Sequence, residues 1–178
     1  YVLFYGNTAK SNDTDTSSLG GAIYNGGNTS PKNTMITNSK FEANVSIGNL
    51  QDLVVYGGGA ILNDSGAAIR NQDETAEDQS GLVNTQFIGN YAFADGGAIY
   101  NSGGKTEAGN VLVKAVIYAS DVLFKGNYAG QYNNKIFNGS EANRAYGSGG
   151  AVLNKGYFEI KQDSNENESF GFDGNYAH

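Results

Sequence analysis

Hydrophobic residues occur along this chain in short runs, separated by longer polar segments rich in Gly, Asn, Asp and Ser. Two kinds of run recur and alternate. One reads Gly-Gly-Ala-aliphatic, with an Asn two residues after the aliphatic position, and the other reads Phe-x-small-Asn. Neither shows a 3.6-residue period, and turn-forming residues bound both. The pattern therefore predicts short β-strands joined by turns and argues against a helical repeat.

Copies of the two motifs extend over nearly the whole chain. The Gly-Gly-Ala motif comprises Gly20, Gly21, Ala22, Ile23 and Asn25; Gly58, Gly59, Ala60, Ile61 and Asn63; Gly96, Gly97, Ala98, Ile99 and Asn101; and Gly149, Gly150, Ala151, Val152 and Asn154. The Phe motif comprises Phe4 and Asn7, Phe41 and Asn44, Phe87 and Asn90, Phe124 and Asn127, and Phe172 and Asn175. Recurrence of this kind is typical of a repeat protein.

The spacing of the motifs indicates the kind of repeat. Successive Phe motifs lie 37, 46, 37 and 48 residues apart, and successive Gly-Gly-Ala motifs 38, 38 and 53. With two motifs per repeat, each motif has roughly 19 to 25 residues, enough for one coil of a parallel β-solenoid. We therefore expect an all-β parallel β-solenoid in which each motif marks one rung, with about eight rungs.

Equivalent residues of such rungs stack about 4.8 Å apart, so each position must tolerate copies of itself. The aliphatic positions are expected to form one interior column, and the phenylalanines aromatic layers in the same interior. An inward-facing asparagine ladder is predicted from the next residues on the same strand face, which are Asn25, Asn63, Asn101 and Asn154. The paired glycines suit a bend or a close approach between coils.

Polar segments between the motifs are predicted to be loops: 11–18, 71–80, 130–148 and 162–169. Loops of a solenoid usually carry its ligand contacts, because the stacked core is already specified. We expect Tyr132 and Tyr146, in the longest insert, to contact a ligand, since exposed tyrosines stack on sugars or protein partners. The apolar run 111–118 is interpreted as buried strand, either one or two around a corner.

Residues 1–178 are expected to form a single solenoid segment. The chain starts and ends at the same point of the repeat, and neither end resembles the polar cap that blocks an open solenoid edge. The segment is interpreted as an internal piece of a longer array, or as a subunit whose ends stack on neighbouring copies.

Composition narrows the class of partner. The chain has 26 glycines, one proline and no cysteine, so collagen and disulfide scaffolds are excluded. A formal net charge of −7 is opposite to what a phosphate-binding surface needs, which argues against nucleic acid. Twelve tyrosines and nine phenylalanines are too many aromatic residues for a disordered acidic chain. No apolar run approaches the roughly 20 residues of a membrane span.

The pairing of Gly-Gly-Ala-[Ile/Val/Leu] with Phe-x-x-Asn resembles the repeats of the chlamydial polymorphic outer-membrane protein family, whose motifs also occur in adhesin-like proteins. The resemblance rests on nine motif copies. It implies a right-handed parallel β-helix passenger domain, exported by the autotransporter route to the cell surface or extracellular space. It also implies adhesion to a host or neighbouring-cell surface protein or glycan.

Candidate chemistry is sparse. Acidic residues do not recur at equivalent repeat positions, and they fall in separate loops around 13–15, 73–78 and 163–168. The sequence therefore predicts a non-enzymatic protein without catalytic residues, cofactor or assigned metal ligands. Calcium binding by the oxygen-rich loop 12–15 stays open, although the nonapeptide of calcium β-rolls is missing. Asn44 and Asn63 match the glycosylation sequon but, as motif residues, are expected to stay unmodified.

Three functions follow. The expected one is a cell-surface adhesin or structural rod that acts through its side loops. The first alternative is a polysaccharide lyase or hydrolase, which needs carboxylates or a basic residue converging in one groove. The second alternative is a stacking subunit of an extracellular fibre or sheath, suggested by the equal phase of the two ends.

Overall fold

The computed structural model of the chain is all-β, and the residues that it describes form short strands and no helix. The described residues are 1–10, 18–26, 33–47, 56–64, 66–73, 75–93, 95–103, 105–106, 112–130, 148–161 and 170–177. Over these ranges no helix is long and apolar enough to cross a membrane. The predicted strand-and-turn architecture is confirmed for this part of the chain.

Parallel pairing joins equivalent residues of successive repeats. The Phe motif lies on β1 (Val2–Tyr5), β7 (Ser39–Glu42), β12 (Leu82–Ile88), β17 (Val116–Lys125) and β21 (Gly171–Asp173). Along this ladder each phenylalanine pairs directly with the phenylalanine of the next repeat. The same sheet includes β5 (Asn33–Thr34), β6 (Ile36–Thr37), β11 (Ala68–Ile69) and β20 (Tyr157–Lys161).

Two further parallel ladders carry the other repeat positions. The Gly-Gly-Ala motif continues into β4 (Ile23–Asn25), β10 (Ile61–Asn63), β14 (Ile99–Asn101) and β19 (Val152–Asn154). The Phe motif is followed by β2 (Thr8–Lys10), β8 (Val45–Ile47), β13 (Tyr91–Ala92), β18 (Tyr128–Ala129) and β22 (Tyr176–Ala177). Short pairs are β3 (Ser18–Gly20) with β9 (Tyr56–Gly58), parallel, and β15 (Lys105–Thr106) with β16 (Leu112–Val113), antiparallel. The apolar run at 112–118 is divided between β16 and β17, as the two-strand interpretation expected.

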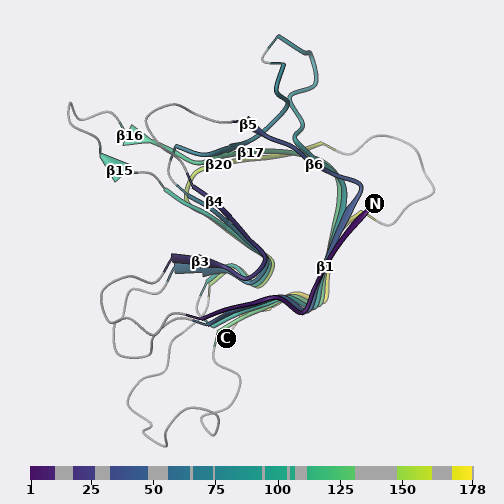
Figure 1. Cartoon of the computed structure of the whole chain (residues 1–178), viewed down its shortest axis with the longest axis vertical. Helices are drawn as coiled ribbons and strands as arrows, with labels where there is room; N and C mark the ends of the chain where they lie inside the picture. The colour runs from purple at the N-terminus through teal and green to yellow at the C-terminus, as the bar shows by residue number, and fades with distance from the viewer. Residues whose placement is uncertain are drawn as a thin grey trace, which may run out of the picture.

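Each motif pairs with the same motif of the next repeat, and this corrects the expectation that every motif marks its own rung. Paired asparagines of the two motifs are 37 to 53 residues apart, a whole repeat. One circuit of the chain, which we call a pass, therefore carries both motifs on different sheets, and successive passes overlie one another (Figure 1). The prediction of one motif per rung is wrong, and the count of about eight rungs loses its basis. The reason is that the chain turns several corners between the two motifs.

The small residue of the Phe motif makes one of these corners. Its φ is positive in every copy: 63° at Gly6, 54° at Ala43, 59° at Gly89, 60° at Gly126 and 58° at Gly174. A residue with a Cβ is strained in this left-handed region, so glycine is favoured. Space is not the restriction, because a Cβ on Gly89 would meet no atom within 4 Å.

The second glycine of the Gly-Gly-Ala motif is required for a different reason. A Cβ on Gly59 would lie 2.0 Å from the carbonyl oxygen of Gly97 in the next pass. A Cβ on Gly21 would lie 1.9 Å from the carbonyl oxygen of Gly59, and a Cβ on Gly97 would lie 1.9 Å from that of Gly150. No side chain fits between the passes here, which confirms the expected close approach.

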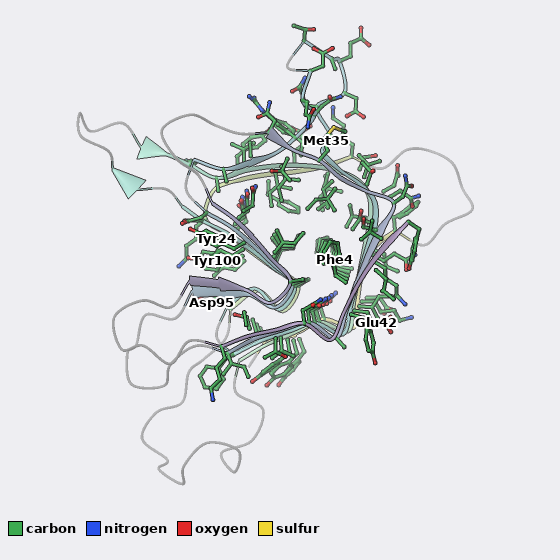
Figure 2. The ribbon with its side chains drawn as sticks, in the orientation of Figure 1. Phe4, Tyr24, Met35, Glu42, Asp95 and Tyr100 are labelled. Atoms are coloured by element: carbon green, nitrogen blue, oxygen red, sulfur yellow. The ribbon has the colours of Figure 1, made fainter. Side chains whose placement is uncertain are left out.

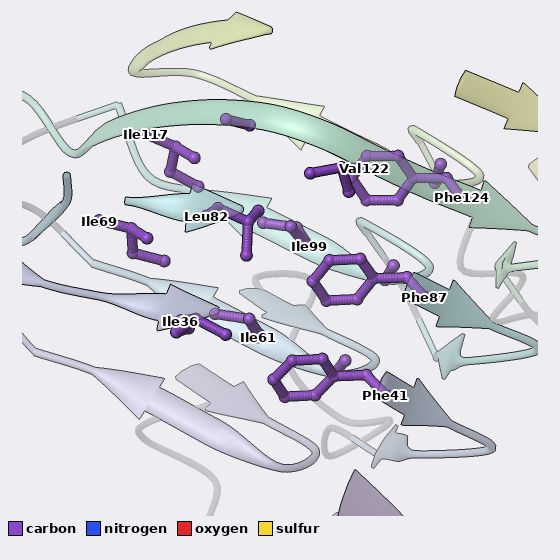
Figure 3. Packing of buried hydrophobic residues seen from close by; sticks show 14 residues of the cluster. Ile36, Phe41, Ile61, Ile69, Leu82, Phe87, Ile99, Ile117, Val122 and Phe124 are labelled. Atoms are coloured by element: carbon purple, nitrogen blue, oxygen red, sulfur yellow. The ribbon is translucent and has the colours of Figure 1, made fainter. Parts of the chain in front are cut away.

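Columns of similar side chains fill the interior (Figure 3). The rings of Phe41, Phe87 and Phe124 are fully buried and stacked, with centroids 4.9 and 5.0 Å apart. Ile61 and Ile99, aligned by the pairing of β10 with β14, pack in the same cluster. Because burial of each such side chain contributes about 1.5–3 kcal/mol, these columns supply much of the stability. The predicted aliphatic and aromatic columns are confirmed.

Candidate functional site

The asparagines of the Gly-Gly-Ala motif form a hydrogen-bonded ladder along the stack. The Nδ2 atom of Asn25 donates to Oδ1 of Asn63 at 2.7 Å, and that of Asn63 to Oδ1 of Asn101 at 2.8 Å. Asn101 continues the ladder to Oδ1 of Asn154 at 2.8 Å. Asn63 and Asn101 are fully buried, so the predicted inward-facing ladder is confirmed at its centre.

The Phe motif builds a second asparagine ladder that the sequence reasoning missed. It runs from Asn7 through Asn44, Asn90 and Asn127 to Asn175, with Nδ2···Oδ1 distances of 2.8 to 2.9 Å. The signal for it was present in the sequence, because Asn occupies the fourth position of every Phe motif.

Every polar atom of a central amide in this second ladder has a partner. Nδ2 of Asn44 donates to the carbonyl oxygen of Phe4 and to Oδ1 of Asn90, both at 2.9 Å. Its Oδ1 accepts from the backbone N and from Nδ2 of Asn7, at 3.1 and 2.8 Å. Two donors and two acceptor sites are thus used. Such an amide stabilises the stack and has no capacity left for a ligand.

The motif residues named from the sequence therefore lie in the stacked columns, the turns and the ladders, and Phe172, at the end of its column, is 59% exposed. Tyr132, Tyr146 and the loop at 12–15 lie outside the described residues. Among the described residues, no group of three or more His, Cys, Asp or Glu side chains is placed to hold a metal ion.

One loop on the surface of the stack spans 71–81, of which the structure describes 71–73 and 75–81. Ile69 pairs with Ile117 and Leu82 with Ala119, so twelve residues (70–81) occupy the place of Tyr118 alone. The preceding pass has one residue there too, because Thr34 pairs with Ile69 and Ile36 with Leu82. Eleven residues are thus inserted without shifting the register. The inserted loop projects from the sheet at the top of Figure 1.

Internal hydrogen bonds give the inserted loop its shape. The backbone N of Thr75 and its Oγ1 donate to Oδ1 of Asp73 at 2.9 and 2.7 Å, and the backbone N of Ser80 donates to Oδ1 of Asp78 at 2.9 Å. These bonds hold the pKa values of both carboxyl groups below their ordinary range. At the neck, Asn71 N donates to the Gln79 carbonyl oxygen at 2.9 Å. The predicted loop at 71–80 is thus a compact projection.

Beside the inserted loop, β17 and β20 present a polar aromatic cluster. Oη of Tyr157 donates to Oε2 of Glu159 at 2.5 Å, and this bond raises the pKa of Tyr157 to about 12. Nζ of Lys161 lies 3.7 Å from Oε1 of the same carboxylate. The ring of Tyr118 is tilted 50° to that of Tyr157, with centroids 5.3 Å apart.

A second group of polar side chains lies on the left of the stack in Figure 2, around Tyr24, Tyr100 and Asp95. Oη of Tyr24 donates to Oδ2 of Asp64 at 2.9 Å, while Nζ of Lys155 lies 5.4 Å from the ring centroid of Tyr100. Burial raises the pKa of Asp95, although the Ser148 backbone N donates to its Oδ1 at 3.0 Å.

Comparison with known proteins shows which family of repeats this sequence is similar to. A family model for the Chlamydia polymorphic membrane protein repeat matches residues 1–26 and 84–102. Each matched segment holds one Phe motif and one Gly-Gly-Ala motif, the two elements that form the ladders. Over these two segments the chain is similar to that repeat. No curated protein and no solved structure matches the chain.

Polymorphic membrane proteins are outer-membrane surface proteins, and the repeat match supports a cell-surface or outer-membrane association for this chain. The two matched segments cover a minority of the residues. The intervening motifs on β7 and β10, and on β17 and β19, nevertheless pair in register with the matched ones on β12 and β14. The asparagine ladders therefore continue beyond the segments that match the repeat model.

Proposed function

We propose that the chain is a right-handed parallel β-helix that acts as a non-enzymatic cell-surface adhesin or rod. Its outer loops contact proteins or glycans of a host or neighbouring cell. The handedness follows the general rule that crossovers between parallel strands are right-handed in about 98% of cases. The repeat match supports the surface location.

The observation that carries the proposal is that the motif residues hold the stack together, whereas the inserted loop lies outside it. The central motif amides, such as those of Asn44 and Asn90, use all their hydrogen-bonding atoms inside the stack. The eleven inserted residues at 71–81, by contrast, leave the register of Leu82 with Ala119 intact. A scaffold of this kind lets surface loops vary without loss of the fold, which is what an adhesin needs.

The test compares a loop variant with a scaffold variant. Deletion of 71–81 joins Arg70 directly to Leu82 and restores the single connecting residue of the neighbouring passes. We expect this variant to keep its thermal unfolding transition and to lose part of its binding to intact cells. Gly59→Ala, whose Cβ has no space, should lose fold and binding together. A wild-type chain that binds no cell, surface protein or glycan would refute the adhesin proposal.

The non-enzymatic part has its own test. The purified chain is incubated with acidic and with neutral polysaccharides, and new reducing ends and unsaturated products are measured. We expect neither to increase above the blank. A steady, concentration-dependent release of either product would replace the adhesin by the polysaccharide-active alternative.

A further inference from the structure

The polar aromatic cluster beside the inserted loop is built on the outer face of the largest sheet. Strand β17 pairs with β20 so that Val116 lies beside Tyr157, Tyr118 beside Glu159 and Ser120 beside Lys161. Successive side chains of a strand alternate between the two faces of the sheet. Ile117 and Ala119 belong to the buried core, so these alternate residues point outward.

Tyr157 presents an exposed aromatic ring on this face. Its side chain is 45% exposed, and the tilted ring of Tyr118 supports one side of it. A tyrosine has few rotatable bonds, so it offers a large, rigid contact area that binding does not need to order. The hydrogen bond from Oη to Glu159 restricts the ring further.

Hydrogen-bonding groups surround the ring. Glu159 uses Oε2 for Tyr157, while Oε1 is turned toward the ammonium group of Lys161 at 3.7 Å. A carboxylate has about four lone-pair sites and an ammonium three donors, so both retain capacity for further partners. A rigid apolar ring flanked by a fixed acceptor and a donor matches a sugar ring, which has an apolar C–H face and hydroxyls at its rim.

The inserted loop forms one side of this platform. Asp78, near the end of the loop, is close enough to Lys161 for the lysine charge to contribute to its lowered pKa. The loop leaves the sheet between β11 and β12, at the register of Tyr118 in the neighbouring β17, and β17 in turn pairs with β20. A ligand seated on Tyr157 would therefore touch both the sheet and the loop.

Charge defines the class of sugar. Among the charged groups that contact one another at the platform, the carboxylates of Glu159 and Asp78 outnumber the ammonium group of Lys161, and the whole chain has a formal net charge of −7. Sialylated or sulfated glycans would be repelled by this field, because like charges disfavour association. Uncharged hexoses and N-acetylhexosamines meet no such repulsion.

We propose that Tyr118, Tyr157, Glu159 and Lys161, with the inserted loop at 71–81, form a binding platform for a neutral glycan. The C–H face of one sugar ring packs on Tyr157, and its hydroxyls bond to Glu159 and Lys161. This proposal rests on the adhesin function proposed above and assigns it a ligand class.

An array of uncharged hexose and N-acetylhexosamine oligosaccharides, printed beside their sialylated and sulfated forms, tests the platform. We expect the wild-type chain to bind uncharged members and to bind their anionic forms more weakly. Tyr157→Ala should reduce this binding at least about tenfold, the equivalent of about 1.4 kcal/mol. Tyr157→Phe keeps the ring and loses the bond to Glu159, so a loss of about fivefold is expected.

Tyr176→Ala is the matched control, because Tyr176 is a tyrosine of similar exposure on a different sheet. It should leave glycan binding unchanged, and all variants should keep the wild-type unfolding transition. Preference for anionic glycans, or equal binding by wild type and Tyr157→Ala, would overturn the platform. Cell binding that persists in Tyr157→Ala would overturn the platform and leave the adhesin function standing, whereas a wild type that binds neither glycans nor cells would overturn both.

Discussion

Phe41 and Phe87 lie face to face, with ring centroids 4.9 Å apart and ring planes 8° apart, although they belong to different repeats. Phe124 stacks on the other side of Phe87 at 5.0 Å. Phe87 is thus enclosed along the stack by its own equivalents, and its ring has no exposed surface. The stack is held together by contacts between residues that occupy one position of the repeat.

Truncation of the central ring should therefore be costly. Phe87→Ala is expected to lower the free energy of unfolding by about 3–5 kcal/mol, since it removes a buried ring and leaves a cavity between two others. Phe87→Leu fills more of that volume and should cost less. Urea unfolding followed by tyrosine fluorescence measures both. A cost below about 1 kcal/mol for the alanine variant would show that the ring is not packed as described.

The left-handed corner predicts a pair of opposite effects. Ala43→Gly relieves a residue with a Cβ at a φ of 54° and is expected to stabilise the chain by about 1 kcal/mol. Gly89→Ala introduces the same strain at the equivalent corner, where no clash complicates the comparison, and should destabilise by a similar amount. Chemical denaturation of the two variants gives the signs. Effects of equal sign would contradict the account of this corner.

The second asparagine ladder predicts a large effect from one amide. Asn90→Ala removes the donor to the Phe41 carbonyl oxygen and the acceptor for Asn44, both in the interior. Unsatisfied buried groups cost about 1–3 kcal/mol each, so a loss of at least about 3 kcal/mol is expected. Asn71→Ala, in the inserted loop, is the matched control and should cost less than about 1 kcal/mol. Equal losses in the two variants would indicate that the ladder contributes little.

Asp95 predicts a dependence of stability on pH. Burial raises the pKa of Asp95 in the folded chain, so folding favours the protonated carboxyl group. Its contribution is fully present below the unfolded pKa, near 3.8, and is lost as pH rises through the higher folded value. Asp95→Asn keeps an acceptor for the Ser148 backbone N and removes the charge. The stability of the variant relative to wild type should therefore increase above about pH 4. A difference that is constant from pH 3 to pH 7 would contradict this reasoning.

The repeat sequence predicted which residues point to the interior, but it did not predict how many motifs one circuit of the chain contains. Asn25 and Asn63 could be placed in a ladder, because their spacing of two from an aliphatic residue puts them on the interior face. The alternation of two motifs is compatible with one motif per coil or with both in a single pass. Only the pairing of Phe87 with Phe124 and of Ile99 with Val152 decides between these arrangements.

Surface features were harder to predict, for a physical reason. Stacking constrains interior positions to similar residues, whereas outward positions are free to differ from pass to pass, as Val116 and Tyr157 do. Tyr157 and Glu159 therefore have no repeat signal. The loop at 71–81 could be recognised from its polar composition, but its position beside β20 depends on the register of the sheet.

Cross-linking of engineered cysteines tests the central claim, that like motif lies on like motif, most directly. Gln86 and Leu123 are paired residues on the outer side of β12 and β17, and the chain has no cysteine of its own. Directly paired strand residues lie within the reach of a disulfide, for which the Cα atoms must be about 4.4–6.8 Å apart. We expect Gln86→Cys with Leu123→Cys to cross-link on mild oxidation, and Gln86→Cys with Tyr100→Cys, which joins neighbouring motifs, to stay reduced. The reverse outcome would place one motif on each rung and contradict the structure described here.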